Sequence, residues 1–231
     1  MYRFIKRLCD FVLSLIAIVC LLWLLIPITI ILLLTGEHYV FYFQERIGLG
    51  GKPFKVWKFA TMLKNSPNIG TGTVTVRNDP RVLPFGGFLR KTKLNELPQL
   101  INILIGNMSI IGPRPMVRKG FETYSEEVRE AVSKMKPGLS GIGSVVFRDE
   151  EYYISLANDP VGFASEVIHP HKGNLEIWYY KNRSLYVDFM IIFLTVWVII
   201  FPKSDLIYKV FPTLPRKDFM KEVEKYNKKE E

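Results

Sequence analysis

The stretch that decides how this chain folds is FVLSLIAIVCLLWLLIPITIILLL, residues 11–34, which carries no charged side chain. Only Ser14 and Thr29 in it are polar. At ~1.5 Å per residue a straight helix over this stretch reaches about 36 Å, enough to cross a hydrocarbon layer of about 30 Å. A cleaved signal peptide fits poorly, because the stretch is too long and no small-residue cleavage site follows it. The stretch therefore predicts a membrane helix.

Two features argue against a simple span. Pro27 lies inside the stretch, where it removes one backbone donor and favours a kink or a break. Basic residues flank the stretch on both sides, namely Arg3, Lys6 and Arg7 before it and Arg46, Lys52, Lys55 and Lys58 after it. A span would place one basic set outside, against the positive-inside tendency. From these residues alone, a span and a re-entrant helix that turns at Pro27 are both open.

The remaining composition is that of a globular protein with anionic partners. The chain has 231 residues, of which 48% are hydrophobic and 23% charged, which excludes a disordered chain. Its net charge of +9 suggests phosphates, nucleic acid or an acidic membrane face as partners. Nucleic acid is not expected, because no helix carries a basic stripe. The two cysteines cannot form a disulfide framework.

Two further elements can be predicted from apolar patterns. Residues 39–46 and 54–59 are aromatic-rich runs around Gly48-Leu49-Gly50-Gly51, which predicts a β-hairpin. Residues 189–201 form an apolar run too short to span a membrane, with an aromatic residue at every fourth position. This run predicts either an interfacial helix or an ordinary core helix. Residues 65–78 are rich in Gly, Thr, Asn and Pro and predict a surface loop.

Residues 94–106 contain the most informative local pattern. Asn95 is a good helix N-cap residue, and Glu96 would lie in the first turn of the helix, where negative charge is favoured. Leu97, Leu100, Ile101 and Leu104 then mark one apolar face, and Gly106 is expected to end the helix. The pattern predicts a short helix whose N-terminus attracts phosphate.

A second candidate for phosphate binding follows at Gly112-Pro113-Arg114-Pro115. Two prolines around Arg114 restrict the local backbone and hold the guanidinium in few directions, which suits two-pronged phosphate binding. A rigid turn without function is the alternative. Residues 116–135 predict one amphipathic helix, residues 138–143 a flexible loop, and residues from Arg216 onward a charged, solvated helix.

Ordered motifs along most of the chain resemble the bacterial sugar transferases, also called monotopic phosphoglycosyl transferases. The N-terminal motif is Lys6-Arg7-x-x-Asp10-Phe11 before the proline-containing helix. The soluble motifs are Gln44-x-Arg46-x-Gly48, Phe54-Lys55-x-x-Lys58-Phe59, Asp79-Pro80-Arg81, Leu89-Arg90-Lys91, Leu94-Asn95-Glu96-Leu97-Pro98-Gln99 continuing through Asn102, Gly106-Asn107-Met108-Ser109, Gly112-Pro113-Arg114-Pro115 and Pro137-Gly138-Leu139-Ser140-Gly141.

The resemblance implies an α+β, helix-rich fold. Its expected parts are a re-entrant membrane helix broken at a proline, one β-hairpin, and amphipathic interfacial helices around a membrane-level active site. The expected domains are residues 1–36 for the re-entrant helix, 37–215 for the cytoplasmic catalytic domain and 216–231 for a charged tail. The expected location is the cytoplasmic face of the bacterial inner membrane, as a monotopic protein.

The resemblance also implies an activity: transfer of a sugar 1-phosphate from a UDP-sugar to undecaprenyl phosphate, which releases UMP. This is the first membrane step of bacterial glycan assembly, as in lipopolysaccharide or exopolysaccharide biosynthesis. Mg²⁺ is the expected cofactor. The expected partners are UDP-sugar, undecaprenyl phosphate, membrane lipids and downstream glycosyltransferases.

The implied site residues include one departure from the family pattern. The family uses an Asp-Glu pair in catalysis, and here the position of the Asp nucleophile holds Asn95, followed by an intact Glu96. The same two positions are the expected metal ligands. The expected substrate-binding residues are Lys58, Arg81, Arg90, Arg114 and Arg148.

The consequence of Asn95 is that a carboxamide offers no anionic oxygen to phosphorus. We interpret the chain as an inactivated Asp-to-Asn variant, because the other motif residues are kept, and a deliberate change made to trap a complex is favoured over an inherited silent homologue. The alternative function is a non-catalytic membrane protein that binds UDP-sugar or lipid phosphate and scaffolds glycosyltransferases. An unrelated soluble domain on a single span is a third possibility.

Overall fold

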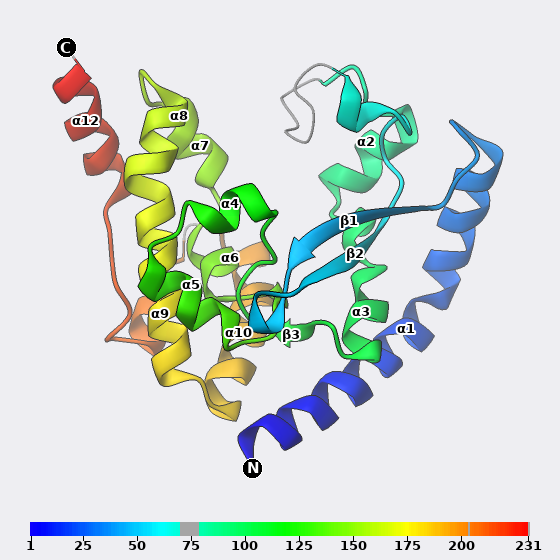
Figure 1. Ribbon diagram of the computed structural model, residues 1–231, viewed down its shortest axis with the longest axis horizontal. Coiled ribbons are helices and arrows are strands. Elements are labelled where there is room, and N and C mark those ends of the chain that lie inside the picture. Colours follow the sequence, from blue (N-terminus) through cyan, green and yellow to red (C-terminus); the bar gives the residue numbers. More distant parts are fainter. Residues whose placement is uncertain (70–78, 203, 231) are drawn as a thin grey trace. The chain divides into compact units, whose positions relative to one another are not determined.

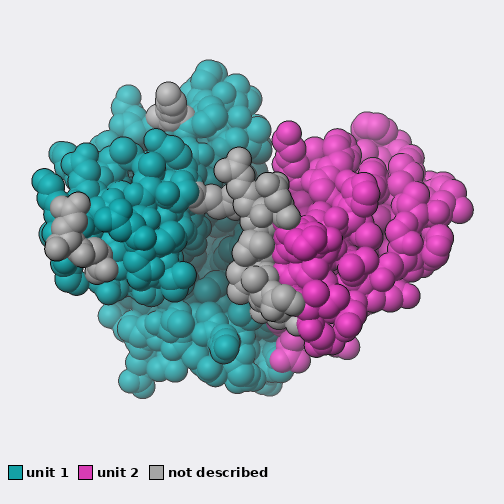
Figure 2. Space-filling view, turned by 90° about the horizontal axis from the view of Figure 1, so that it is seen from above, with its two compact units in different colours: residues 1–6, 46–53, 107–231 teal, residues 7–45, 54–106 magenta. Residues whose placement is uncertain are grey.

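The computed structural model describes residues 1–69, 79–202 and 204–230, and it confirms the helix-rich α+β class (Figure 1). The chain forms two compact units, which are coloured separately in Figure 2. Unit 1 comprises residues 1–6, 46–53 and 107–231, and unit 2 comprises residues 7–45 and 54–106. The expected domain division into residues 1–36, 37–215 and 216–231 concerns the membrane and the tail, and it stays a prediction.

Helix α1 (Tyr2–Leu34) contains the whole apolar stretch, and it is long and apolar enough to cross a membrane. The expected break at Pro27 is not found, because the helix continues through the proline from Tyr2 to Leu34 (Figure 1). The Thr29 hydroxyl donates to the Leu25 carbonyl at 2.8 Å, a side-chain bond of the kind that bends helices. Beyond the proline, Ile28 and Leu32 are buried, whereas most apolar side chains before it are exposed.

Strands β1 (Phe41–Ile47) and β2 (Pro53–Phe59) form the predicted hairpin. Its turn contains the short 3-10 helix η1 (Leu49–Gly51). Gly50 and Gly51 have φ of 72° and 70°, a left-handed conformation that glycine adopts without steric cost. Phe41 stacks on Phe59 across the two strands, with ring centroids 5.8 Å apart.

The rest of unit 2 packs on this hairpin through a small apolar core. Ile28 and Leu32 of α1 meet Phe59 of β2 and Leu89 of α2. The remaining elements of the unit are η2 (Ser66–Asn68), α2 (Pro84–Lys91), η3 (Leu94–Glu96) and α3 (Gln99–Ile105). Of the predicted surface loop over 65–78, residues 66–68 form the 3-10 turn η2, and residues 70–78 lie outside the described residues.

Unit 1 contains a parallel pair of short strands that the sequence analysis did not predict. Strand β3 (Ser109–Ile111) pairs with β4 (Gly138–Ser140), so the prediction of a flexible loop over 138–143 is wrong. The cause is close backbone packing: a Cβ on Gly138 would lie 2.2 Å from the Gly112 nitrogen, and one on Gly112 would lie 2.3 Å from the Lys136 carbonyl oxygen. Only glycine permits this approach.

Helices form the rest of unit 1 around one large core. They are α4 (Arg118–Glu122), α5 (Glu126–Ser133), α6 (Ile142–Val146), α7 (Glu150–Ser155), α8 (Pro160–Phe163), the π-helical η4 (Ala164–Ile168), α9 (His169–Asn182), α10 (Leu185–Ile200), α11 (Leu206–Val210) and α12 (Phe219–Glu230). The prediction of one helix over 116–135 is wrong, because Ser125 accepts the Val128 N–H and starts α5 as a new helix.

Helix α10 is apolar on two faces. One face is buried in the core and includes Ile191 and Leu194. The other face exposes large apolar side chains, including Phe189 and Phe193 at the predicted four-residue spacing. These two faces give α10 properties of both predicted alternatives, the core helix and the interfacial helix.

Helix α12 confirms the expected helix near the C-terminus, but it is only partly solvated. Phe219, Val223 and Tyr226 are buried in the core of unit 1. The Asn227 side chain accepts the Asn158 N–H at 2.8 Å and donates to the Leu156 carbonyl at 3.1 Å. The apolar spacing within the charged tail therefore marks a packed helix.

Candidate functional site

The Asn95-Glu96 pair lies in the 3-10 turn η3 of unit 2, and the prediction that Asn95 caps a helix is wrong. Lys93 has a φ of 61°, which separates η3 from α2, and α3 begins at Gln99 after Pro98. The C-terminal prediction is confirmed, since Gly106 has a φ of 96° and its N–H bonds back into α3. Because α3 is so short and starts four residues after Asn95, it offers no phosphate site at Asn95.

Asn95 is only 8% exposed, and its Oδ1 is a buried acceptor without a hydrogen bond in the described part of the chain. An unpaired buried polar atom costs free energy, typically about 1–3 kcal/mol. A ligand that donates to or coordinates the oxygen would satisfy this buried acceptor. The neighbouring Glu96 makes this position the candidate site.

Glu96 is held by Lys58, the last but one residue of β2. Lys58 Nζ lies 3.1 Å from Glu96 Oε1, and the two side chains are 18% and 19% exposed. Partial burial weakens solvent screening of this pair relative to a surface ion pair. The structure thus joins two predicted site residues, the Glu96 carboxylate and the Lys58 ammonium, and Glu96 directly follows Asn95 in the chain.

Arg81 and Arg90, also in unit 2, are held differently from each other. Arg81 is nearly buried and forms two side-chain bonds with Asp79, at 2.8 and 2.6 Å. Its Nη1 donates to the carbonyls of Ser66 and Ile69, at 2.7 and 2.8 Å. These four bonds give Arg81 a structural role, and its substrate role stays a prediction.

Arg90 lies in the last turn of α2, and its Nη1 is 3.4 Å from Thr61 Oγ1. Helix α2 rests directly on the backbone of Thr61, since a Cβ on Gly86 would lie 2.2 Å from the Thr61 carbonyl oxygen. The Thr61 carbonyl also accepts the Leu83 N–H at 3.0 Å. The position of Arg90 therefore depends on Gly86, and its predicted substrate role is untested.

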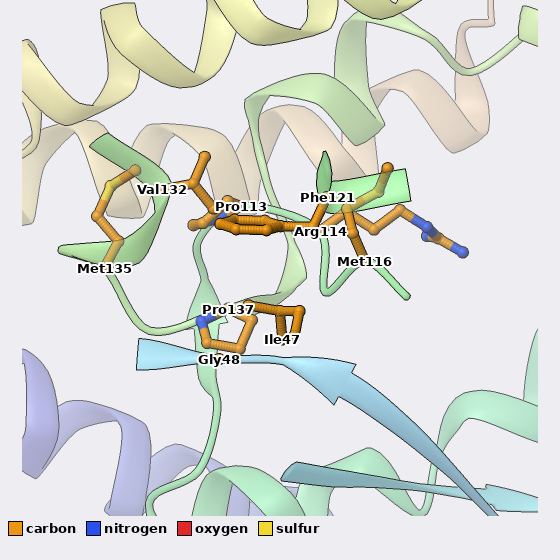
Figure 3. A pocket seen from close by; sticks show the side chains of 9 residues that line it. All are labelled: Ile47, Gly48, Pro113, Arg114, Met116, Phe121, Val132, Met135 and Pro137. Atoms are coloured by element: carbon orange, nitrogen blue, oxygen red, sulfur yellow. The ribbon is translucent and has the colours of Figure 1, made fainter. Parts of the chain in front are cut away.

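Arg114 belongs to unit 1, in a turn that leaves β3. The Pro113 carbonyl accepts the Gly138 N–H at 2.8 Å, and the Pro115 carbonyl accepts from Arg46 Nη1 at 3.2 Å. Figure 3 shows a small apolar pocket beside this turn, with the Arg114 guanidinium extending away from it. Hydrogen bonds to the carbonyls before and after Arg114 fix the backbone of the turn, and the Arg114 side chain is exposed.

Arg148, the other predicted substrate residue of unit 1, donates through Nη1 to the Val198 carbonyl near the C-terminal end of α10. A cation at this end of a helix is favourable, because the last carbonyls are unpaired and the helix dipole is negative there. The contact gives Arg148 a helix-capping role.

The residues at the Asn95 position can be tested for fit to Mg²⁺. No group of three or more His, Cys, Asp or Glu side chains suited to a metal occurs in residues 1–69, 79–202 and 204–230. Mg²⁺ nevertheless often binds through only one or two carboxylates together with substrate phosphates. The buried Asn95 Oδ1 and the Glu96 carboxylate are oxygen donors of the required type, so the position fits a cation shared with a diphosphate.

Three side chains of the quoted family motifs hold this region, and the sequence assigned no structural role to them. Asn102 bonds α3 to β2, and Asp79 pairs with Arg81. Arg7 of α1 donates to the Ile103 and Leu104 carbonyls at the end of α3, at 2.6 and 2.7 Å. Asn102 had a visible signal, because it is an amide inside an otherwise apolar run of a short helix. Arg7 showed no such signal, because its place in the basic flank of the apolar stretch already explained its charge.

Comparisons with known proteins agree with the motifs. A family model described as bacterial sugar transferase matches residues 1–202. The chain is 36% identical over 197 residues to UDP-glucose:undecaprenyl-phosphate glucose-1-phosphate transferase of Escherichia coli (strain K12), covering 84% of this chain and 40% of that protein. It is 34% identical over 215 residues to UDP-galactose-lipid carrier transferase of Erwinia amylovora, covering 86% of this chain and 41% of that protein.

A shorter relative is matched over most of its length. The chain is 33% identical over 205 residues to exopolysaccharide production protein ExoY of Sinorhizobium fredii (strain NBRC 101917 / NGR234), covering 83% of each protein. The chain thus spans about two fifths of the first two relatives and most of the third.

Proposed function

Because this chain belongs to the bacterial sugar transferase family, we propose that it is built to transfer a sugar 1-phosphate from a UDP-sugar to undecaprenyl phosphate. The products are UMP and an undecaprenyl-diphosphate sugar, the first lipid-linked intermediate of a bacterial glycan. The names of the relatives, which include undecaprenyl-phosphate transferases for glucose and galactose, support this substrate class.

The observation that carries the proposal is the buried, unsatisfied Asn95 Oδ1 beside the Glu96–Lys58 pair. Both substrates are anionic, so their approach requires charge neutralisation. Asn95 and Glu96 would hold Mg²⁺, which when bound neutralises part of the charge of the diphosphate. Lys58 holds the Glu96 carboxylate in place through a 3.1 Å ion pair.

The covalent step requires a carboxylate at position 95. In the Asn95→Asp chain, the new carboxylate oxygen attacks the β-phosphorus, the phosphorus bond to the bridging oxygen breaks, and UMP leaves. An oxygen of the lipid phosphate then attacks the same phosphorus, and the carboxylate is released unchanged. Asn95 offers only a neutral amide oxygen. We therefore expect the chain as written to bind UDP-sugar without forming the covalent intermediate or releasing UMP.

The membrane arrangement that fits this function is a re-entrant α1 at the cytoplasmic face of the inner membrane. Tyr2 and Lys6 of α1 reach Asp188 of α10, with bonds of 2.9 and 2.8 Å to its Oδ2. Tyr179 of α9 donates to Oδ1 of the same carboxylate at 2.5 Å. The first six residues therefore pack on unit 1, to which residues 46–53, beyond the apolar stretch, also belong. Both ends of α1 lie on one side of the membrane in this proposal.

This topology is tested by labelling one cysteine. In a chain with both Cys9 and Cys20 changed to serine, Arg3→Cys should react only with reagents that reach the cytoplasm. Reaction with a reagent confined to the periplasm, while the catalytic unit stays cytoplasmic, would refute the re-entrant arrangement. The exposed apolar face of α10 is then expected to lie among the lipid headgroups, at the level of the lipid substrate.

A second function is favoured by Asn95 itself. A chain that binds UDP-sugar or lipid phosphate without turnover would act as a membrane scaffold for downstream glycosyltransferases. The experiment that separates the two is UMP release from a panel of UDP-sugars by the chain as written and by its Asn95→Asp variant, with undecaprenyl phosphate and Mg²⁺. Turnover by Asn95→Asp alone supports the transferase, and no turnover by either chain supports the scaffold.

A further inference from the structure

Asn102 joins α3 to the backbone of β2 through both ends of its side-chain amide. Its Oδ1 accepts the Trp57 N–H at 2.9 Å, and its Nδ2 donates to the Lys55 carbonyl at 2.8 Å. The side chain is fully buried. A donor and an acceptor two residues apart on one edge of a strand are the groups that a neighbouring strand would satisfy. Asn102 thus takes the place of one residue of a third strand beside a two-stranded sheet.

The two backbones that Asn102 joins carry the charged pair of the candidate site. Lys58 directly follows Trp57 on β2, and Glu96 lies in η3 just before α3. Both charges sit on flexible side chains, whose ordering costs conformational entropy. Their 3.1 Å separation therefore depends on how firmly β2 and the start of α3 are held together.

Core packing alone does not account for an amide at this position. The neighbours Leu100 and Ile103 on α3 are buried apolar residues, and an apolar residue at 102 would fill similar space. It would, however, leave the Trp57 N–H and the Lys55 carbonyl without their partner. The amide makes two directed bonds, so it fixes the position of β2 along α3 as well as the distance between them.

We propose that Asn102 is a positioning residue that sets the Lys58–Glu96 pair, and through it the orientation of the Glu96 carboxylate. The assignment of this pair to catalysis rests on the proposed function. The effect of Asn102 on the geometry of the pair, through β2 and α3, does not. Arg7, which binds the carbonyls at the other end of α3, holds the same helix from α1.

The first test measures UMP release in the Asn95→Asp background. Asn102→Leu is expected to lower kcat about tenfold or more and to change KM for UDP-sugar much less, because misorientation affects the chemical step. Asn102→Asp keeps the acceptor for Trp57 N–H, loses the donor to Lys55, and is expected to retain more activity. Ile103→Ala is the control, since it removes buried apolar volume next to Asn102 without a polar contact. An equal fall in kcat for Ile103→Ala at a matched loss of Tm would overturn the proposal.

The second test needs no turnover. Thermal unfolding is measured for Lys58→Met, Glu96→Gln and the double variant, each with Asn102 and with Asn102→Asp. With Asn102, the two single losses in Tm should sum to more than the loss in the double variant, because each single change removes one member of a partly buried ion pair and keeps the other. With Asn102→Asp the losses should become additive, and persistence of the same non-additivity would refute the inference. If Asn95→Asp shows no turnover, the proposed function fails and this cycle alone decides the role of Asn102.

Discussion

At the residue scale, Arg81 and Arg114 show how one predicted role divides between two environments. Arg81 is nearly buried, and among the described residues its side chain bonds to Asp79 and to the carbonyls of Ser66 and Ile69. Arg114 is exposed at a turn whose backbone is fixed by its neighbours. A guanidinium with most donors engaged inside the protein stabilises a loop, whereas one at the surface is accessible to a ligand.

The buried ion pair of Arg81 and Asp79 leads to a prediction about stability. Arg81→Met should lower Tm by roughly 10 °C, because it leaves the Asp79 carboxylate buried without its cation. The double variant Arg81→Met with Asp79→Asn should lose less, since no buried charge then lacks a partner. Differential scanning fluorimetry on the purified chain measures both. An unchanged Tm together with weaker UDP-sugar binding would instead make Arg81 a substrate residue.

Arg114 leads to a prediction about catalysis. In the Asn95→Asp background, Arg114→Lys should lower kcat/KM for UDP-sugar, with a loss of about 2 kcal/mol in transition-state stabilisation, because lysine keeps the charge but lacks the two-pronged fork. The kinetics of UMP release measure this change, and Lys119→Arg on the nearby α4 serves as a control. Kinetics that do not change would reduce Arg114 to part of a rigid turn.

At the element scale, α9 carries a buried carboxyl group and a buried imidazole. Burial raises the pKa of the Glu176 carboxyl to about 8, partly opposed by the Lys172 ammonium. Burial also lowers the pKa of His171 to about 4, with Lys217 acting in the same direction. Glu176 Oε2 has no hydrogen-bond partner among the described residues. Both groups are therefore held neutral at pH 7, which matches their place in an apolar core.

The Glu176 carboxyl should make stability depend on pH. Between its unfolded pKa near 4.5 and its folded pKa of about 8, the folded chain keeps a proton that the unfolded chain has released. Stability therefore falls as pH rises through this window and levels off above it. Glu176→Gln should be more stable than the parent chain at pH 8 and similar to it at pH 5. A parallel pH dependence of Tm in both chains would contradict this assignment.

The contact between α1 and α10 gives a second prediction at this scale. Asp188→Asn keeps an acceptor for Tyr179 but removes the charge that pairs with Lys6. The first turns of α1 should then detach from unit 1 more often, so Arg3→Cys in the cysteine-free background should react faster with maleimide. Lys172→Gln, which removes the ion pair with Glu150 elsewhere in unit 1, is the control and should leave the labelling rate unchanged.

For the whole molecule, apolar patterns and glycine turns predict the large elements well. The apolar stretch predicts α1, the paired aromatic runs predict β1 and β2, and Gly106 correctly ends α3. These signals are local, since each depends on residues within one element. The resemblance to the family, and not these local signals, indicated the residues of the candidate site, of which the structure joins Lys58 and Glu96 directly.

Features that depend on contacts distant in sequence could not be predicted in this way. The β3–β4 pair joins Ser109 to Gly138, and its glycines looked like loop residues because their need for close backbone packing is set by the partner strand. Helix α3 starts later than its N-cap signal suggests, because Lys93 and Pro98 shape the turn around Asn95. The packing of α12 could not be predicted from the charged tail either, because the apolar residues that it contacts belong to helices distant in sequence.

Whether position 95 carries the nucleophile can be measured by the intact mass of the protein after incubation with Mg²⁺ and the UDP-sugar that releases most UMP. The Asn95→Asp chain should gain the mass of one phosphosugar, and addition of undecaprenyl phosphate should remove it. The chain as written should show neither adduct nor UMP release, because Glu96 is one residue further along the turn and is paired with Lys58. Turnover by the chain as written at the rate of Asn95→Asp would contradict the account.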